Sequence, residues 1–213
     1  MQTLHRSLVM NRRVRVLATH LANLIPDNPS LTGLDVGCGS GEVAVAIQAL
    51  RPNVTLEGVD VFVRPQTALP IREFDGKTLP YPENSFDFVM LVDVLHHTHD
   101  PKQILKECTR VAKTAVLIKD HYCNHWFDDI RLRFMDWVGN RSYGVALPYN
   151  YLSFRQWNVL FDELRWFPEV FKRKLKLYPV PFRYLFDSNL HFVTSLKAGE
   201  DLRGFESEKN SEF

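Results

Sequence analysis

Three glycines stand at alternate positions directly after a short apolar run, in the stretch LDVGCGSGEV that spans residues 34–43. A glycine-rich turn between a strand and a helix lets the backbone lie close to a nucleotide. Phosphate loops, dinucleotide-binding turns and the turns of other nucleotide-containing cofactors all use this device. The residues around the turn must therefore decide which ligand it serves.

Two of these ligand classes can be compared directly with the sequence. A Walker-type phosphate loop needs a lysine followed by serine or threonine after its last glycine, and Glu42 and Val43 stand there instead. The dinucleotide pattern GxGxxA does match when it is counted from Gly39, and Asp60 follows Gly41 by 19 residues, near the spacing of a ribose-binding acid. A nicotinamide-dependent dehydrogenase is therefore an alternative on these residues alone.

The acidic residue before the turn favours a different cofactor. Asp35 gives the order Asp-x-Gly-x-Gly-x-Gly, and a carboxylate at this place suits an ammonium group and repels a pyrophosphate. Together with the later stretch DGKTLPYPENSFDFVMLVDVLHHTHDP, this makes the chain resemble class I S-adenosylmethionine-dependent methyltransferases, in particular the small-molecule branch of ubiquinone- and menaquinone-biosynthesis type. The resemblance covers about residues 31–120 motif by motif and reaches the C-terminal strands by topology.

The resemblance implies a cofactor site residue by residue. The glycine turn corresponds to the loop beneath the methionine moiety, and Asp60 to the carboxylate that accepts both ribose hydroxyls. Val61 corresponds to a residue that packs on the adenine, and Asp75 to the acceptor of its amino group. The methylthio centre is expected near Val92 and Asp93. The full implied set is Asp35, Gly37, Cys38 through its backbone, Gly39, Gly41, Asp60, Val61, Asp75, Gly76, Val92, Asp93 and Leu95. S-adenosylhomocysteine is the expected product.

Methyl transfer from a sulfonium is an in-line displacement with a good leaving group, so the protein mainly aligns the nucleophile and excludes water. An oxygen nucleophile can also need a base, and a neutral histidine suits that role near pH 7. The candidates, which lie at or just after predicted strand ends, are His96, His97, Asp120 and His121. The alternative is that a histidine only shapes the loop by hydrogen bonding.

The stretch HHTHD also raises the question of a metal site. Its possible ligands are His96, His97, His99 and Asp100. Adjacent histidines in a loop need a further ligand placed elsewhere before they can hold one ion, and the spacing of His121 and His125 supplies no clear partner. We therefore predict no metal.

Strands and helices alternate along the chain in a way that can position these residues. Helical spacing is found at 12–25, 42–50, 101–111 and 153–163, and apolar runs indicate strands at LTGLDV, VTLEGVD, FDFVMLVD and TAVLIKD. The link at 60–70 is too short and proline-rich for a full helix. FKRKLKLY and NLHFVTSLK are too close for a parallel crossover and should pair antiparallel. We predict an α/β fold of methyltransferase type, with a doubly wound, mostly parallel seven-stranded sheet, an antiparallel last strand and a helical insertion after the fifth strand.

Residues 124–152 form the predicted insertion. NHWFDDIRLRFMDWVG reads as an amphipathic helix, capped by Asn124 and stopped by Gly139, with Trp126, Ile130, Phe134 and Trp137 on one stripe. The insertion could close as a lid over an apolar or aromatic acceptor, with Trp126, Tyr149 and Tyr151 as substrate contacts. The alternatives are a helix packed on the domain's own core and a homodimer contact through residues 124–138.

Composition limits the remaining functional classes. The 213 residues fit one domain over 1–197, followed by a charged and disordered tail at 198–213. The net charge of +1 makes nucleic acid an unlikely partner, and no signal peptide or membrane span is recognised. The three cysteines fit a reducing, cytoplasmic setting. We expect a methyltransferase with a small-molecule acceptor; a non-catalytic S-adenosylmethionine-binding regulatory protein is an alternative.

Overall fold

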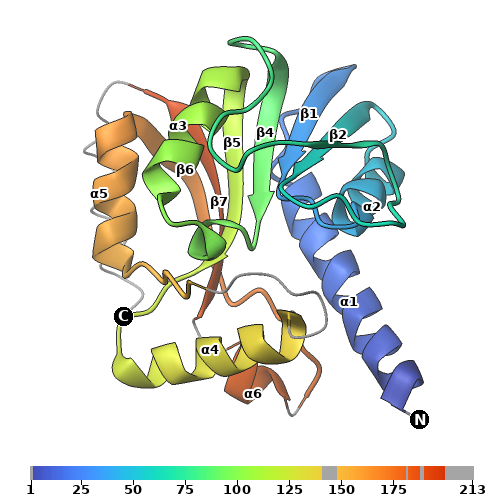
Figure 1. The fold of residues 1–213 in the computed structure, drawn as a ribbon, viewed down its shortest axis with the longest axis vertical. Helices are drawn as coiled ribbons and strands as arrows, with labels where there is room; N and C mark the ends of the chain where they lie inside the picture. The colour runs from blue at the N-terminus through green and yellow to red at the C-terminus, as the bar shows by residue number, and fades with distance from the viewer. Residues whose placement is uncertain (1, 141–147, 181, 188–189, 200–213) are drawn as a thin grey trace.

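The computed structural model describes residues 2–140, 148–180, 182–187 and 190–199. Its centre is a seven-stranded sheet with the order β3-β2-β1-β4-β5-β7-β6 (Figure 1). The strands are β1 (Leu31–Val36), β2 (Val54–Asp60), β3 (Ile71–Glu73), β4 (Phe86–Val92), β5 (Ala112–His121), β6 (Trp166–Arg173) and β7 (His191–Ala198). The first five strands pair in parallel, and β7 runs antiparallel to both β5 and β6. The predicted fold class is therefore confirmed.

Helices cover both faces of the sheet (Figure 1). They are α1 (Gln2–Ala22), α2 (Glu42–Leu50), the 3-10 helix η1 (Leu95–His97), α3 (Pro101–Val111), α4 (Trp126–Asn140), α5 (Phe154–Leu164) and α6 (Phe182–Phe186). Apolar side chains of α1 and α2 pack against one face, and those of α3 and α5 pack against the other. Because both faces are covered, the central strands are apolar almost throughout, as parallel strands require.

The strand β6 lies earlier in the chain than the sequence predicts. We expected FKRKLKLY to be the strand, but β6 ends at Arg173. Lys174 and Lys176 adopt left-handed backbone angles, with φ of 57° and 58°, which no continuous strand permits. Leu175 and Leu177 between them are buried, so the alternating pattern reflects side-chain burial rather than strand geometry.

The link between β2 and β3 contains no helix, as predicted, and it packs directly on the glycine turn. The amide of Ala68 donates to the carbonyl of Ser40 over 2.8 Å. A Cβ placed on Gly41 would lie 1.8 Å from a methyl carbon of Leu69, so only glycine permits this approach. The apolar pattern did not identify β3, because it has three residues and all are at least partly exposed.

The insertion follows β5, and its helix begins at Trp126 without the predicted Asn124 cap. The carboxylate of Asp128 accepts from the amides of Asn124 and His125, over 3.4 and 3.2 Å, and holds the first turn. The helix passes Gly139 and ends at Asn140. The parts of the insertion at 141–147 and of the tail at 200–213 lie outside the described residues. No helix in the described ranges is long and apolar enough to cross a membrane.

The start of α3 gives a stability prediction. The side chain of Asp100 accepts from the amide of Gln103 over 3.0 Å, so Asp100→Ala should lower the free energy of unfolding by about 1 kcal/mol. Urea denaturation measures this loss. Asp162→Ala, an exposed aspartate inside α5, is the matched control and should change stability little. Equal losses in the two variants would contradict the capping role.

Candidate functional site

The glycine turn joins β1 to α2 in a conformation that requires its glycines. Gly37, Gly39 and Gly41 have φ of 69°, 61° and 80°, all in the left-handed region. The amide of Gly37 donates to the carbonyl of Val59 over 2.8 Å, which ties the turn to β2. Cys38 directs its sulfur toward Gly58, since a Cβ on Gly58 would lie 2.7 Å from it. Burial raises the pKa of this thiol, so Cys38 offers the turn its backbone and no thiolate.

Asp35 is buried at the end of β1, and its Oδ1 atom has no hydrogen-bond partner among the described residues. Burial raises the pKa of this carboxyl well above its usual value, and the nearby Asp60 raises it further. A buried carboxylate without a partner is unfavourable, and a cationic donor would relieve it. The atom therefore marks a place where the molecule can receive an ammonium group.

Asp60 lies at the end of β2, beside the turn. One of its carboxylate oxygens accepts from the amide of Gly39 over 2.7 Å, and the other accepts from the amide of Phe62 over 3.1 Å. Each oxygen keeps a second lone pair, so the carboxylate can still accept from two neighbouring hydroxyls. The structure thus places Asp35, Asp60 and the three glycines around one turn.

The residues expected around the adenine also come together. Val61 is exposed, and a Cβ on Gly76 would lie 3.0 Å from one of its methyl carbons. The exposed carboxylate of Asp75 accepts from the amides of Thr78 and Lys77, over 2.7 and 2.8 Å, and these bonds lower its pKa. Both bonds use the same oxygen, so the other oxygen can accept from a ligand.

Arg64 covers the glycine turn and was not anticipated. The three heavy atoms nearest to a Cβ on Gly39 all belong to its guanidinium group, the closest at 3.3 Å. Its position in the link to β3, directly over a turn that is expected to hold a zwitterionic ligand, is not visible in the local sequence. A carboxylate passing over Gly39 would meet this cation.

Asp93, expected near the methylthio centre, is held in an ion-pair cluster. It follows β4 with a φ of 59°, and its carboxylate accepts from Arg13 of α1 and from Lys119 of β5. Burial alone would raise the pKa of Asp93, but the charges of Lys119 and Arg13 hold it far below its usual value. Lys119 is fully buried and also lies 3.2 Å from Nδ1 of His191. Lysine inside the apolar run TAVLIKD was a visible signal for this cluster.

Asp120 organises the end of β5. Its Oδ1 lies 2.6 Å from Nδ1 of His96, and its Oδ2 accepts from the amide of Leu95 over 2.9 Å. Burial would lower the pKa of His96, but Asp120 and the more distant Asp136 raise it to about 10. His96 is therefore an imidazolium near pH 7, and it cannot serve as a base there.

The insertion contributes Asp136, a residue that the sequence analysis missed. It projects from the inner side of α4, with Oδ2 at 3.3 Å from Nε2 of His96, and it accepts a hydrogen bond from the hydroxyl of Tyr151. The ring of Tyr151 stacks on His96 at 5.4 Å between centroids. Tyr151 thus lies at the predicted site. Trp126 does not point inward with Asp136, because it stands on the exposed face of α4.

The other two histidines differ from His96 in charge. Burial lowers the pKa of His97, and the positive charge of His96 lowers it further. Burial also lowers the pKa of His121 well below its usual value. Nδ1 of each is buried without a hydrogen-bond partner in the described part of the chain. Both are neutral at pH 7, and His97 is the less buried.

Tyr149 lies beside this cluster. Its ring centroid is 6.3 Å from that of Tyr151, and the guanidinium of Arg133 in α4 lies over its face at 4.8 Å.

Two groups of side chains in the cluster have the spacing of metal ligands. One group is His96 with Asp120 and His121, and the other is His96 with His97 and Asp136. A metal at either would require His96 to lose the proton that its two carboxylates favour. Of the residues weighed as metal ligands from sequence, His96 and His121 meet in the first group and His96 and His97 in the second.

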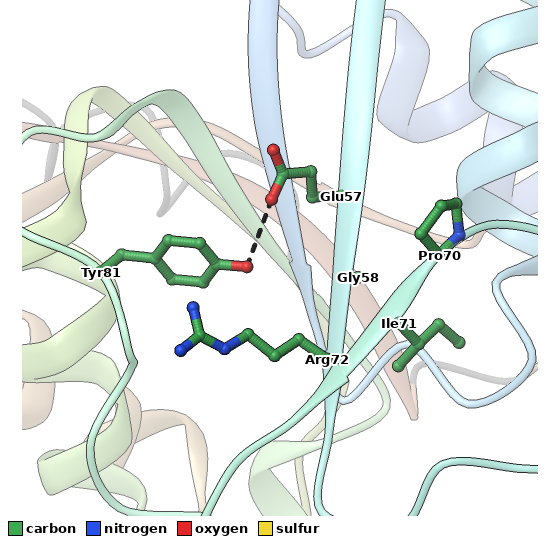
Figure 2. Close-up of a pocket in the computed structure, with 6 residues that line it drawn as sticks. All are labelled: Glu57, Gly58, Pro70, Ile71, Arg72 and Tyr81. Carbon is green, nitrogen blue, oxygen red and sulfur yellow. Dashed lines mark hydrogen bonds between the residues drawn. The ribbon is translucent and has the colours of Figure 1, made fainter.

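An open depression lies at the β2–β3 edge, away from these groups. Figure 2 shows Glu57, Gly58, Pro70, Ile71, Arg72 and Tyr81 around it, with the hydroxyl of Tyr81 donating to Glu57 over 3.3 Å. None of the predicted site residues lines it. Its lining is therefore distinct from the glycine turn, which it adjoins at Gly58 beside the sulfur of Cys38.

The His96 assignment predicts a pH dependence of stability. Because the folded pKa of about 10 exceeds the usual 6.5, protonation of His96 stabilises the fold fully below pH 6.5, and this contribution is lost as the pH rises toward 10. Thermal unfolding of the wild type should therefore show a steeper fall in Tm between pH 6.5 and 10 than that of His96→Gln. The exposed His125→Gln serves as control and should follow the wild type. Parallel curves for the wild type and His96→Gln would contradict the assignment.

Parts of the chain are similar in sequence to known methyltransferases. Residues 34–118 match the family model described as a methyltransferase domain. The 27-O-demethylrifamycin SV methyltransferase of Amycolatopsis mediterranei is 28% identical over 110 residues, which cover 46% of this chain and 40% of that protein. The ubiquinone biosynthesis O-methyltransferase of Colwellia psychrerythraea is 26% identical over 124 residues, half of each chain. The chain thus spans half or less of these curated relatives.

Solved structures resemble nearly the whole chain. A methyltransferase of Haloferax volcanii, solved in complex with the Trm112 methyltransferase activator, has a TM-score of 0.70 at 17% identity, covering 92% of this chain and 94% of that one. A protein of Thermotoga maritima, described as a methyltransferase dependent on S-adenosylmethionine, has a TM-score of 0.64 at 17% identity, covering 93% and 95%. At such identities the likeness concerns the fold.

Proposed function

We propose that this chain, whose residues 34–118 match the family model of a methyltransferase domain, is a class I S-adenosylmethionine-dependent methyltransferase that transfers a methyl group to a small apolar or aromatic acceptor. The observation that carries the proposal is the buried Asp35 carboxylate, whose Oδ1 lacks a partner in the described residues, beside a turn of three left-handed glycines. A zwitterionic, nucleoside-containing cofactor matches both features. Bound there, S-adenosylmethionine supplies an electrophilic methyl group on a sulfonium.

The chain's own residues account for the binding of each part of the cofactor. Asp35 would accept from its ammonium group, and Arg64 would pair with its carboxylate above Gly39. Asp60 would accept from the ribose hydroxyls, and Val61 with Gly76 would contact the adenine. A dinucleotide fits less well, because its pyrophosphate would approach the Asp35 carboxylate.

The acceptor would bind at the ends of β4 and β5, beneath α4. His96 and His97 follow the end of β4 there, and Tyr149 and Tyr151 supply aromatic surface. Two curated relatives are named as enzymes that methylate oxygen, which supports an oxygen nucleophile and the quinone-type branch as the finer proposal. The chain covers half of those proteins or less, so their acceptors serve as a guide for screening.

His97 is the proton acceptor that we propose for a hydroxyl nucleophile. It is neutral because its pKa is lowered, and it is less buried than His96 and His121. His96 and Asp120 would act as positioning residues, since their hydrogen bond fixes the loop that carries His97. We propose that no metal takes part, because a metal would have to displace the proton shared between His96 and its carboxylates.

Calorimetric titration with S-adenosylhomocysteine tests the cofactor assignment. Asp60→Ala and Arg64→Gln should each weaken binding by about tenfold or more, equivalent to ~1.4 kcal/mol. Arg72→Gln is the matched control, because Arg72 lines the depression of Figure 2 rather than the glycine turn. Binding of NADH in place of S-adenosylhomocysteine would overturn the proposal in favour of a dehydrogenase.

Turnover with a panel of phenols and other hydroxyl acceptors tests the base. His97→Gln should lower kcat by about 10² or more while leaving S-adenosylhomocysteine affinity unchanged. The pKa of His97 is lowered from the usual histidine value of 6.5. The kcat/KM of the wild type should therefore stay constant down to pH 6.5 and fall only at more acid pH. The exposed His99→Gln is the control and should retain activity. Unchanged kcat in His97→Gln would exclude this role, and cofactor binding without turnover would favour a regulatory protein.

A further inference from the structure

The helix α4 is oriented with its apolar side toward solvent. The stripe predicted from sequence, together with Phe127, is between 49% and 75% exposed; its members are Trp126, Phe127, Ile130, Phe134 and Trp137. The opposite side carries the buried Leu132 and the buried, charged Asp136. A surface helix of a monomer normally has the reverse arrangement. The exposure of this stripe argues against the alternative in which it packs on the domain's own core.

The exposed apolar surface continues from α4 onto α6. The rings of Phe134 and Phe186 stack with centroids 6.5 Å apart, and α4 and α6 lie together at the lower end of the molecule (Figure 1). Phe182 of α6 is 47% exposed. We call the combined surface the aromatic face; it consists of Trp126, Phe127, Ile130, Phe134 and Trp137 of α4 and of Phe182, whose ring stacks on that of Phe186 in α6. A contiguous apolar surface of this kind marks an interaction site.

Basic residues border the aromatic face. Tyr178 contacts Phe186 at 5.8 Å between ring centroids, and the exposed Lys176 and Lys174 precede it in the chain. The left-handed backbone at both lysines turns Leu175 and Leu177 into the core and leaves the ammonium groups outside. The exposed Arg12 of α1 joins them, since its guanidinium donates to the carbonyl of Lys176 over 3.5 Å.

The acidic residues of α4 do not offset these charges at the surface. Asp136 points inward to His96 and Tyr151. Asp129 is paired with Arg133 at 2.7 Å, and Asp128 lies 4.0 Å from the guanidinium of Arg131. The face therefore presents aromatic side chains with a positive border.

We propose that the aromatic face docks on an anionic lipid surface, with α4 and α6 lying in the headgroup region and Lys174, Lys176 and Arg12 contacting the headgroups. Tryptophan, phenylalanine and tyrosine suit the boundary between headgroups and acyl chains, and nearby cations are attracted by anionic lipids. A second copy fits less well. A symmetric contact would bury the aromatic side chains against one another but would give the positive border no anionic partner.

The lipid surface would also explain where the acceptor comes from. Asp136 on the inner side of α4 contacts His96, so the helix that would lie on the lipid also covers the proposed acceptor site. An apolar acceptor dissolved in the membrane could then reach that site without crossing water. This last step rests on the proposed function, whereas the docking itself does not.

Sedimentation with lipid vesicles tests the docking. The full-length protein should bind vesicles of phosphatidylcholine mixed with phosphatidylglycerol at least tenfold more tightly than vesicles of phosphatidylcholine alone, and added salt should weaken that binding. The double variants Trp126→Ala/Phe134→Ala and Lys174→Gln/Lys176→Gln should each lose tenfold or more. Leu50→Ala on α2 and Val159→Ala on α5 remove exposed apolar side chains elsewhere and should bind as the wild type does.

Light scattering and cofactor titration separate the other outcomes. A wild-type dimer that Trp126→Ala/Phe134→Ala converts to a monomer, without vesicle binding, would assign the face to a second copy and overturn the proposal. Absence of vesicle binding by a monomeric wild type would overturn it too. The same variants should titrate S-adenosylhomocysteine normally. Vesicle binding by a protein that fails this titration would support the docking while refuting the proposed function.

Discussion

The carboxylate of Asp120 binds three hydrogen-bond donors at the end of β5 and so joins η1 to that strand. It binds the Nδ1 proton of His96, the amide of Leu95 and the amide of His121, all out of contact with water. A buried carboxylate stays charged only while such partners remain, so these bonds are mutually dependent. Through His96 the same carboxylate also orders Asp136 and Tyr151, which connects the insertion to the edge of the sheet.

The acidic side chains at this edge of the sheet differ in whether the described residues supply them with a cationic partner. Asp93 is compensated by Arg13 and Lys119, and Asp120 by His96. Asp35, on the neighbouring strand β1, is buried with one oxygen that no described residue binds. Because an uncompensated buried carboxylate destabilises the fold, its presence indicates a place prepared for a cationic ligand. The contrast among these three acidic residues supports the proposed cofactor site at Asp35.

Much of this arrangement follows from local sequence. The alternation of strands and helices and the bounds of α2 and α3 could be predicted, because apolar periodicity and helix-boundary residues are encoded within a few positions of the chain. Contacts between distant segments could not, and they include Arg13 with Asp93 and Asp136 with His96. The aromatic stripe on α4 was visible, but its outward orientation was not, since periodicity defines a face without defining what covers it.

The most direct test is a crystal structure of the complex with S-adenosylhomocysteine. The account predicts the ligand's amino group within hydrogen-bond distance of Oδ1 of Asp35, its carboxylate beside Arg64 and its ribose hydroxyls at Asp60. A nucleoside bound instead in the depression at the β2–β3 edge, with Asp35 still unpaired, would contradict it.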